Sequence, residues 1–418
     1  MKRMAVWLSV LLLAASTGAS SGQRQGAAVR WVGTWTTAAI ARHYPSAAES
    51  AAAPAAARPQ GMAAAIPLPK DQTLRQIVRI TTGGDRLRVT VTNAFGTNPL
   101  AIGAARVAIR ASEATIAADS SQVLTFSGRS AFEIPPGAIA VSDPVTLRCP
   151  SFADLAIDLF FPGDTGAQVV TIHRYSRQTS YLSAVGNHVG VANFPVAEKL
   201  TAWYFLGGVE VAPPRSGPVI VALGDSITDG TASTTDANRR WPDQLARRLG
   251  KAAVLNAGIG GNRLLSDSIP EFGYNILARF NRDVLMQPGA THVVILEGIN
   301  DIGNAGENAA PSAPDLIAAL KQLIDRAQGR GLRVIGATLT PFGGAAYFTE
   351  VGEAKRQAVN AWIRTGHAYD GVIDFDRAVL DPGQPTRFKA SFDSGDHLHP
   401  SDAGYEAMGS AIDLALFK

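Results

Sequence analysis

The chain has 418 residues, which is too long for one ordinary domain and predicts two, each with a core of its own. Its 38 Lys and Arg nearly balance its 35 Asp and Glu, so the formal charge of +3 excludes strong electrostatic attraction to nucleic acid. The single cysteine, Cys149, excludes an internal disulfide, so the hydrophobic core must hold the fold.

The first apolar run, residues 4–15, predicts a secretory signal peptide. It follows Lys2 and Arg3, precedes a run of small residues, and is too short to span a bilayer. No cysteine directly follows it that could carry a lipid anchor. We therefore expect that residues 1–22 are removed, that the chain has no membrane span, and that the protein is exported to the periplasm or out of the cell.

Residues 23–211 are predicted to form an all-β domain of the sandwich or jelly-roll type. Short runs of strand-forming residues alternate with turn residues, and helical periodicity is almost absent. Gly83-Gly84-Asp85 separates two of these runs and predicts a hairpin. The predicted strands are 31–35, 77–81, 87–92, 104–110, 122–126, 155–161 and 169–175.

Within this domain, residues 38–69 are rich in Ala, Pro and Ser. Few large apolar side chains are present, so we expect a long surface loop rather than a packed element. The alternative is that this loop folds over a binding cleft, because long loops in compact domains often carry function.

Residues 219–418 follow a predicted linker at 212–218 and change to alternating strands and helices. The predicted buried strands are 219–223, 253–256, 292–297, 333–339 and 372–375. The predicted helices are 241–249, 274–285, 314–328, 351–364 and 403–416. This order predicts a three-layer α/β/α domain with a five-stranded, mostly parallel sheet.

The first of these strands ends in Gly224-Asp225-Ser226. The strand is apolar on both faces, as buried parallel strands are, and ligands bind at the carboxyl edge of such sheets. A serine there can expose its hydroxyl while its backbone N–H faces a developing oxyanion. Taken alone, however, the pattern favours a helix cap, so the role of Ser226 depends on partners elsewhere in the chain.

Three further polar loops supply those partners. Residues 256–262 are rich in glycine, which lets backbone N–H groups approach a ligand. Residues 297–301 contain Asn300, and residues 396–400 contain Asp396 and two histidines. Because an ester-cleaving site needs a hydroxyl, a base, an acid that orients the base, and donors to the oxyanion, these loops together predict nucleophilic catalysis.

The chain resembles the SGNH, or GDSL, hydrolase family through four blocks that occur in the family's order. They are Gly224-Asp225-Ser226, Asn256 to Gly261, Gly298-Ile299-Asn300-Asp301 and Asp396-His397-Leu398-His399-Pro400. The resemblance implies that Ser226 is the nucleophile and that His399 and Asp396 complete its triad. It also implies that Ser226, Gly261 and Asn300 donate hydrogen bonds to the oxyanion. One small departure is the sequence Glu-Gly-Ile-Asn-Asp, where a second glycine is common before Asn.

The resemblance extends more weakly to the first domain, which is similar to the N-terminal part of some secreted two-domain members. The similar segments are Trp31-Val32-Gly33-Thr34-Trp35 and residues 72–79. These segments say little about the substrate.

Several residues near the predicted site have competing interpretations. His397 and His399 beside Asp396, with Asp393 nearby, leave a metal site as an alternative. The serine chemistry already explains His399, so we expect no metal or other cofactor. The loop 340–348 follows the fourth strand and is predicted to line the pocket, with a packed loop as the alternative. Its aromatic residues are Phe342, Tyr347 and Phe348.

The remaining histidines and one turn are assigned to structure. No partner pattern accompanies His43, His173, His188, His292 or His367, so we expect each of them to be structural. Asp229-Gly230 is predicted to be a turn.

We therefore predict a secreted serine ester hydrolase that forms an acyl-enzyme on Ser226. Its ester substrate is expected to be an acetylated polysaccharide, and a lipase, an aryl esterase or an acyltransferase is the alternative. A carbohydrate-binding protein that has lost activity is the alternative from another class.

Overall fold

The computed structural model describes residues 29–42, 67–214, 217–303 and 310–418. The predicted signal peptide at 1–22 and most of the predicted loop at 38–69 lie outside these residues. Trp31–Lys418 form one compact unit. Among the described residues, no helix is both long and apolar enough to cross a membrane.

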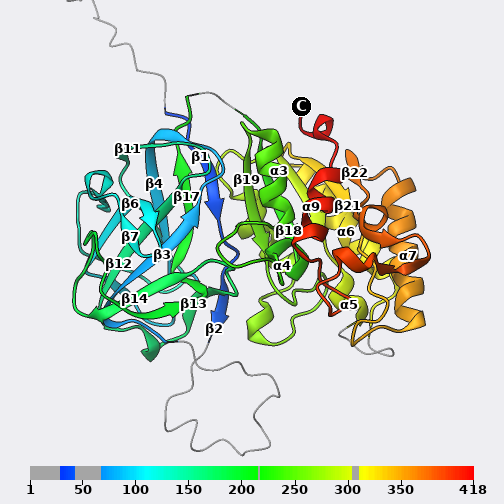
Figure 1. The fold of residues 1–418 in the computed structure, drawn as a ribbon, viewed down its shortest axis with the longest axis horizontal. Helices are drawn as coiled ribbons and strands as arrows, with labels where there is room; N and C mark the ends of the chain where they lie inside the picture. Colours follow the sequence, from blue (N-terminus) through cyan, green and yellow to red (C-terminus); the bar gives the residue numbers. More distant parts are fainter. Residues whose placement is uncertain (1–28, 43–66, 215–216, 304–309) are drawn as a thin grey trace, which may run out of the picture. The chain divides into compact units, whose positions relative to one another are not determined.

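The first part of the compact unit is all-β and its strands pair antiparallel (Figure 1). A five-stranded sheet contains β1 (Val32–Thr36), β4 (Gly84–Thr92), β10 (Ile139–Val141), β11 (Val145–Cys149) and β17 (Leu206–Val211). A seven-stranded sheet contains β3 (Lys70–Arg79), β6 (Ala104–Ser112), β7 (Thr115–Ile116), β8 (Gln122–Val123), β12 (Asp154–Asp164), β14 (Ser180–Val185) and β15 (Val196–Leu200). Smaller sheets contain β2 (Ile40–Arg42), β13 (Val170–Arg174) and β16 (Ala202–Tyr204), and β5 (Leu100–Ile102) with β9 (Phe132–Ile134). The all-β prediction is confirmed.

The strands on either side of Gly83-Gly84-Asp85 do not form the predicted hairpin. β3 pairs with β12 and β14, whereas β4 pairs with β10, β11 and β17. The connection is held by Thr34 of β1, whose hydroxyl donates to Thr82 O at 2.6 Å and whose carbonyl accepts from Thr81 N at 3.0 Å. The chain therefore crosses between two sheets here, and the hairpin prediction is wrong.

A short strand also lies inside the segment predicted as a loop. β2 pairs with β13, and Ile40 is 2% exposed. Arg42 forms an ion pair with Glu271 at 3.3 Å between Nη1 and Oε1. Residues 38–42 are thus packed: Ala38 and Ala39 are buried, and Arg282 Nη2 of the second part donates to Ala39 O at 3.0 Å.

The second part contains a parallel sheet with the strand order β19 (Ala253–Gly258), β18 (Val219–Gly224), β20 (His292–Leu296), β21 (Arg333–Ala337) and β22 (Gly371–Ile373). Short helices follow three strand ends: α2 (Ser226–Asp229), α5 (Ile299–Gly303) and α8 (Phe375–Val379). The longer helices are α3 (Trp241–Leu249), α6 (Ala313–Gln328), α7 (Glu350–Thr365) and α9 (Asp402–Ala411), with α4 (Ile276–Phe280) continuing into a π-turn at Asn281–Leu285. β23 (Leu380–Asp381) and β24 (Gln384–Phe388) form a separate antiparallel pair.

The helices fall into two groups around the sheet (Figure 1). α3 packs on β19 and contacts α9, which contacts α8, whereas α6 packs on β21 and contacts α4 and α7. The five-stranded α/β/α prediction is confirmed. Because the sheet is parallel, the polar loops after β18, β19 and β20 meet at its carboxyl edge.

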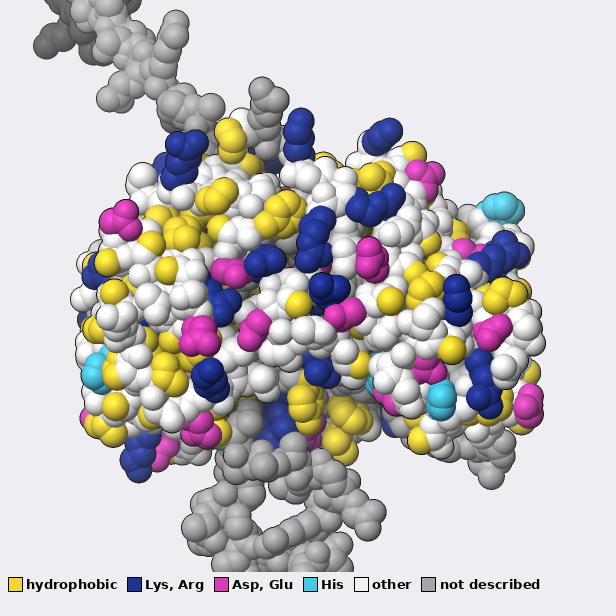
Figure 2. Space-filling view, in the orientation of Figure 1, with side chains coloured by type: hydrophobic (Ala, Val, Ile, Leu, Met, Phe, Trp, Pro, Cys, Tyr) yellow, Lys and Arg dark blue, Asp and Glu magenta, His cyan; other side chains and the backbone are white. Residues whose placement is uncertain are grey.

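The all-β part packs directly on the edge strand of this sheet. β1 lies beside β19, and Val254 N donates to Thr81 Oγ1 at 3.0 Å. Gly33 N donates to Pro288 O at 2.8 Å. On the face shown in Figure 2, basic and acidic side chains are interspersed, as the small net charge leads one to expect.

Candidate active site

Ser226, His399 and Asp396 form a continuous chain of hydrogen bonds. Ser226 Oγ lies 2.8 Å from His399 Nε2, and His399 Nδ1 lies 2.6 Å from Asp396 Oδ2. The other carboxylate oxygen, Oδ1, accepts from His399 N at 2.8 Å and Leu398 N at 3.0 Å. The structure thus brings together the three side chains that the sequence predicts as a triad.

The electrostatics of Asp396 favour its ionised form. Burial disfavours the charge, but the hydrogen bonds and positive charge of His399 outweigh burial and hold the pKa of Asp396 below its ordinary value. The carboxylate can therefore orient the imidazole and balance the positive charge that forms on it when it takes a proton.

The strand-to-helix turn at Ser226 depends on its two neighbours. Asp225 caps α2, because its Oδ1 accepts from Ile227 N at 2.8 Å, as expected for a helix-start carboxylate. Burial raises the pKa of Asp225 to about 7. A Cβ on Gly224 would lie 2.3 Å from Thr228 Oγ1 and 2.5 Å from Leu296 O, so the turn requires glycine there.

The glycine and asparagine loops meet the serine loop through hydrogen bonds. Ile259 N donates to Gly224 O at 3.1 Å, and Asn300 Nδ2 donates to Asn262 O at 3.0 Å. Gly261 has a φ of +72°, and a Cβ there would lie 2.5 Å from the Phe272 ring. Asn300 and the segment next to Gly261 are therefore held against each other, as the predicted oxyanion site requires.

Sequence reasoning missed Arg279, which is buried behind these loops. Its guanidinium donates to Gly224 O at 3.0 Å, to Ala257 O at 2.8 Å and to Asn262 Oδ1 at 2.9 Å. It also pairs with Asp283 at 2.9 Å between Nη1 and Oδ2. A signal was present, because Arg279 interrupts the apolar face of the 274–285 segment and has a carboxylate four residues later.

The aromatic residues of the 340–348 loop have different positions. Phe342 is fully buried and packs on Tyr347 and Phe348 at ring centroid distances of 6.1 and 5.1 Å. Phe342 thus belongs to the core behind the site and does not line an open pocket. Tyr347 reaches the site, because its hydroxyl donates to Asn300 Oδ1 at 3.4 Å. Burial, with the carboxylates nearby, raises the pKa of Tyr347 well above its ordinary value, so the phenol stays protonated.

His397, the other histidine of the last block, pairs with Asp393 at 2.6 Å between Nδ1 and Oδ2. Its φ is +63°, and its side chain is 45% exposed. Within the described parts of the chain, no three His, Cys, Asp or Glu side chains are placed together to hold a metal ion.

Residues 222–407 match the model of the GDSL-like Lipase/Acylhydrolase family. This region is similar to GDSL-like lipases and acylhydrolases. The matched region includes Ser226, Asn300, Asp396 and His399, and the all-β part lies before it. The match agrees with the resemblance carried by the four blocks, all of which lie within residues 222–407.

Several solved structures match just under half of the chain. A putative lipolytic protein of the G-D-S-L family from Desulfitobacterium hafniense has 21% identity and a TM-score of 0.37, over 46% of this chain and 96% of that one. An aryl esterase from M. smegmatis has 17% identity and a TM-score of 0.38, over 46% and 95%. Est24, a carbohydrate acetylesterase from Sinorhizobium meliloti, has 14% identity and a TM-score of 0.37, over 46% and 95%. No curated protein matches the chain.

Proposed function

We propose that the GDSL-like domain hydrolyses carboxylic esters through an acyl-enzyme on Ser226. The observation that carries this proposal is the hydrogen-bond chain from Ser226 Oγ through His399 to Asp396, at 2.8 and 2.6 Å. A hydroxyl that is hydrogen-bonded to an imidazole, which a carboxylate orients in turn, is the arrangement that activates a serine nucleophile.

In the first half of the reaction, Ser226 Oγ attacks the ester carbonyl carbon while His399 Nε2 takes the hydroxyl proton. Asp396 accepts the Nδ1–H hydrogen bond and stabilises the imidazolium. When the tetrahedral intermediate collapses, His399 returns the proton to the leaving oxygen, and the alcohol departs.

In the second half, water attacks the acyl group on Ser226, and His399 takes a proton from the water. Collapse breaks the bond between the acyl carbon and Ser226 Oγ, which regains its proton from His399. The carboxylic acid leaves. An alcohol in place of water would give acyl transfer by the same steps.

The oxyanion of both intermediates is proposed to accept from the backbone N–H groups of Ser226 and Gly261 and from the amide of Asn300. The position of Asn300 supports this role, since Asn262 O and the Tyr347 hydroxyl fix both ends of its amide. Donors that are fixed in advance stabilise a developing charge without reorganising during the reaction.

For the substrate, we propose short acyl groups, acetyl first, on a polysaccharide outside the cytoplasm. The pattern of residues 1–22 supports export, and an all-β part packed on the catalytic domain supports a polymeric substrate. The mass of the mature protein tests export, because removal of the signal peptide predicts an N-terminus near residue 22.

The activity is tested with p-nitrophenyl acetate, butyrate and decanoate, followed by acetylated xylan, with S226A as the matched variant. The proposal predicts turnover that is fastest with the short acyl chains and is lost in S226A. Absence of turnover on every ester, with polysaccharide binding retained in S226A, would replace the hydrolase by a carbohydrate-binding protein.

A further inference from the structure

The helix that begins at Ser226 has only four residues, Ser226–Asp229. A single helical turn is not stable by itself, because nucleation costs more than one turn of hydrogen bonds returns. The geometry of α2 must therefore come from its contacts.

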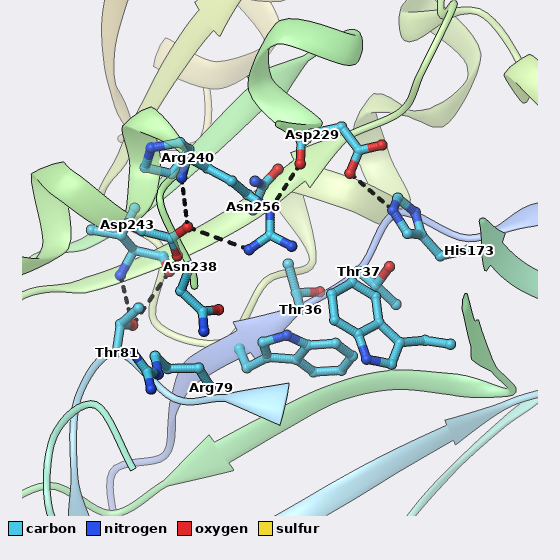
Figure 3. A pocket seen from close by; sticks show the side chains of 14 residues that line it. Thr36, Thr37, Arg79, Thr81, His173, Asp229, Asn238, Arg240, Asp243 and Asn256 are labelled. Carbon is cyan, nitrogen blue, oxygen red and sulfur yellow. Dashed lines mark hydrogen bonds and ion pairs between the residues drawn. The ribbon is translucent and has the colours of Figure 1, made fainter. Parts of the chain in front are cut away.

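Three side chains hold the carboxyl-terminal end of α2. Asn256 Nδ2 donates to Thr228 O at 2.7 Å, and Arg240 Nε donates to Asp229 O at 2.9 Å. His173 Nε2 lies 3.0 Å from Asp229 Oδ1. Of these three, His173 belongs to the all-β part, where it lies on β13 and points at Asp229 (Figure 3).

Both ring nitrogens of His173 face acceptors. Nε2 faces the Asp229 carboxylate, and Nδ1 lies 2.9 Å from the carbonyl oxygen of Ala38. A neutral imidazole carries one N–H, so one of its nitrogens would turn a lone pair toward an oxygen, whereas an imidazolium donates from both nitrogens. The side chain of His173 is 4% exposed, so solvent cannot relieve such a mismatch.

We propose that His173 is a buried imidazolium that positions α2, and with it Ser226, from the all-β part. The inference rests on the proposed function, because it matters for catalysis only if Ser226 is the nucleophile. Asp229 transmits the contact directly, since it lies three residues after Ser226 and its N–H donates to Asp225 O at 2.9 Å. His173 is then a positioning residue, and the structural role expected from sequence is extended to the reaction.

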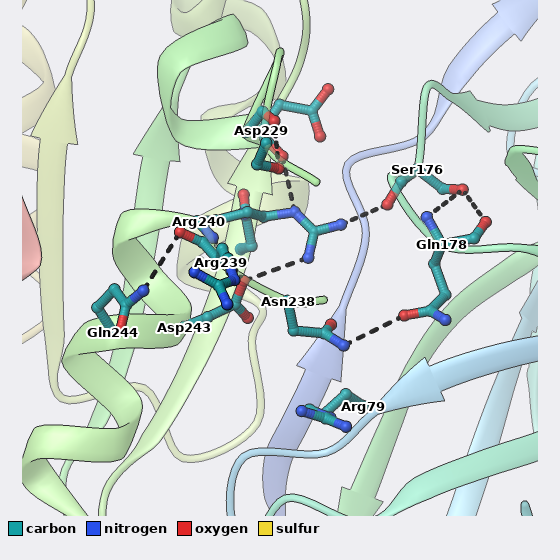
Figure 4. Close-up of polar contacts among 12 residues, drawn as sticks. Arg79, Ser176, Gln178, Asp229, Asn238, Arg239, Arg240, Asp243 and Gln244 are labelled. Carbon is teal, nitrogen blue, oxygen red and sulfur yellow. Dashed lines mark hydrogen bonds and ion pairs between the residues drawn. The ribbon is translucent and has the colours of Figure 1, made fainter. Parts of the chain in front are cut away.

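Of the charged groups around His173, Asp229 contacts the ring directly, and the two nearby arginines are engaged with other partners. Besides Asp229, the charged residues that line the same pocket are Arg79, Arg240 and Asp243 (Figure 3). Arg240 opposes the charge of His173, but its guanidinium is engaged with Asp229 O, Ser176 O and Asp243 (Figure 4). Arg79 is paired with Asp154 at 2.8 Å.

The other surroundings of the His173 ring also favour its protonated form. The Trp203 ring lies 5.6 Å from the imidazole, centroid to centroid, where a cation is favoured over an aromatic face. Burial alone would lower the pKa of His173, but the charge of Asp229 and the hydrogen bonds to Asp229 and Ala38 outweigh burial and raise it above its ordinary value.

Because the pKa is raised in the folded state, the stabilisation is complete below the ordinary histidine pKa of about 6.5. It is lost as the pH rises through the folded pKa. The contact of His173 that holds α2 in place should therefore weaken as the pH rises, and kcat should fall there while KM changes little.

The direct test is ¹⁵N NMR of the histidine rings in the unmodified protein, with His173 assigned through its contacts to Trp203. The proposal predicts that both ring nitrogens of His173 carry protons at about pH 7 and lose one only at a higher pH. A neutral ring at that pH would overturn it, and this result does not depend on activity or on any variant.

The functional test compares H173Q with H188Q, whose parent histidine lies in the same all-β part and has Nε2 beside Val185 O. Gln at position 173 can donate to Asp229 but carries no charge, so kcat should fall about tenfold with KM within about twofold. Its alkaline loss of kcat should also disappear, whereas H188Q should behave as the unmodified protein. If H173Q does not fold, D229N serves as the second variant, and its His173 should become neutral at a lower pH.

The two proposals fail in different ways. Turnover by S226A would overturn the proposed function while leaving the NMR result for His173 standing. Normal hydrolysis and an unchanged pH profile in H173Q, or in D229N if H173Q does not fold, would overturn the positioning role alone.

Discussion

Arg279 Nη2 donates to the carbonyl oxygen of Gly224 at 3.0 Å, across 55 positions of the chain. The same guanidinium donates to Ala257 O and Asn262 Oδ1, so one buried side chain joins the end of β18 to the glycine loop after β19. Ser226 lies two residues after Gly224, and Gly261 lies between Ala257 and Asn262. The hydrogen bonds of Arg279 therefore fix the position of Ser226 relative to Gly261.

Replacing this side chain should affect both stability and activity. Arg279→Met removes a donor from three buried oxygens, of which Gly224 O keeps the Ile259 N–H, while Asp283 keeps its contact with Arg282 at 2.6 Å. We expect a loss of about 3–5 kcal/mol in the free energy of unfolding and a lower kcat/KM. Arg330→Met, at an exposed position, is the control for thermal unfolding. Equal melting temperatures for the two variants would contradict the role of Arg279.

Asn300→Ala tests the oxyanion site. Loss of one fixed donor should lower kcat by about 100- to 1000-fold with little change in KM, since the donor acts on the transition state. Tyr347→Phe removes the hydroxyl that contacts Asn300 Oδ1 and keeps the ring, so it should reduce kcat less than tenfold. An Asn300→Ala variant with a normal kcat would remove Asn300 from the oxyanion site.

Asp396→Asn tests the orientation of the base. Without the carboxylate, His399 loses both its correct tautomer and the partner of its positive charge, so kcat should fall on the order of 10³- to 10⁴-fold. Asp393→Asn is the matched control, because Asp393 pairs with His397, and its kcat should remain within a few fold. Similar kinetics for both variants would mean that Asp396 does not have this role.

Asp396 also gives a pH prediction. Its pKa is lowered in the folded protein, so its contribution to stability is complete above the ordinary value of about 4 and is lost as the pH falls below it. Unfolding midpoints at decreasing acid pH should therefore fall more steeply for the unmodified protein than for Asp396→Asn. Parallel curves would show that the pair does not contribute in this way.

The pKa of Asp225 is shifted in the opposite direction, so its pH prediction has the opposite sign. Its pKa is raised to about 7, so the fold favours the protonated carboxyl; this contribution is complete below about pH 4 and is lost as the pH rises through about 7. Asp225→Asn keeps the oxygen that accepts from Ile227 N and removes the buried charge. Relative to the unmodified protein, its melting temperature should rise by several degrees between about pH 5 and pH 8. A difference that does not change with pH would contradict the assignment.

Local patterns predicted the elements of the second part well. The spacing of apolar residues predicts a helix over 241–249, and α3 has these bounds. The five apolar runs become the five parallel strands. The bounds of α2 and α5 were not predicted, because four or five residues are too few to show a period of 3.6.

Partners across the chain were harder to predict. Alternation in residues 77–92 indicated two strands but not that β3 and β4 belong to different sheets. His173 and Asp229 are 56 positions apart, and nothing near either residue marks the other as its partner. Ser226, His399 and Asp396 were predicted together because family blocks mark them, whereas Arg279 and His173 are recognised only through the contacts that the fold creates.

The central claim is that Ser226 is the nucleophile. Its most direct test is the mass of the protein after reaction with an alkyl fluorophosphonate, followed by peptide mapping, with S226A treated in parallel. The account predicts one covalent phosphonyl group on Ser226 Oγ and no label in S226A. An unlabelled protein, or a label on another residue that persists in S226A, would contradict it.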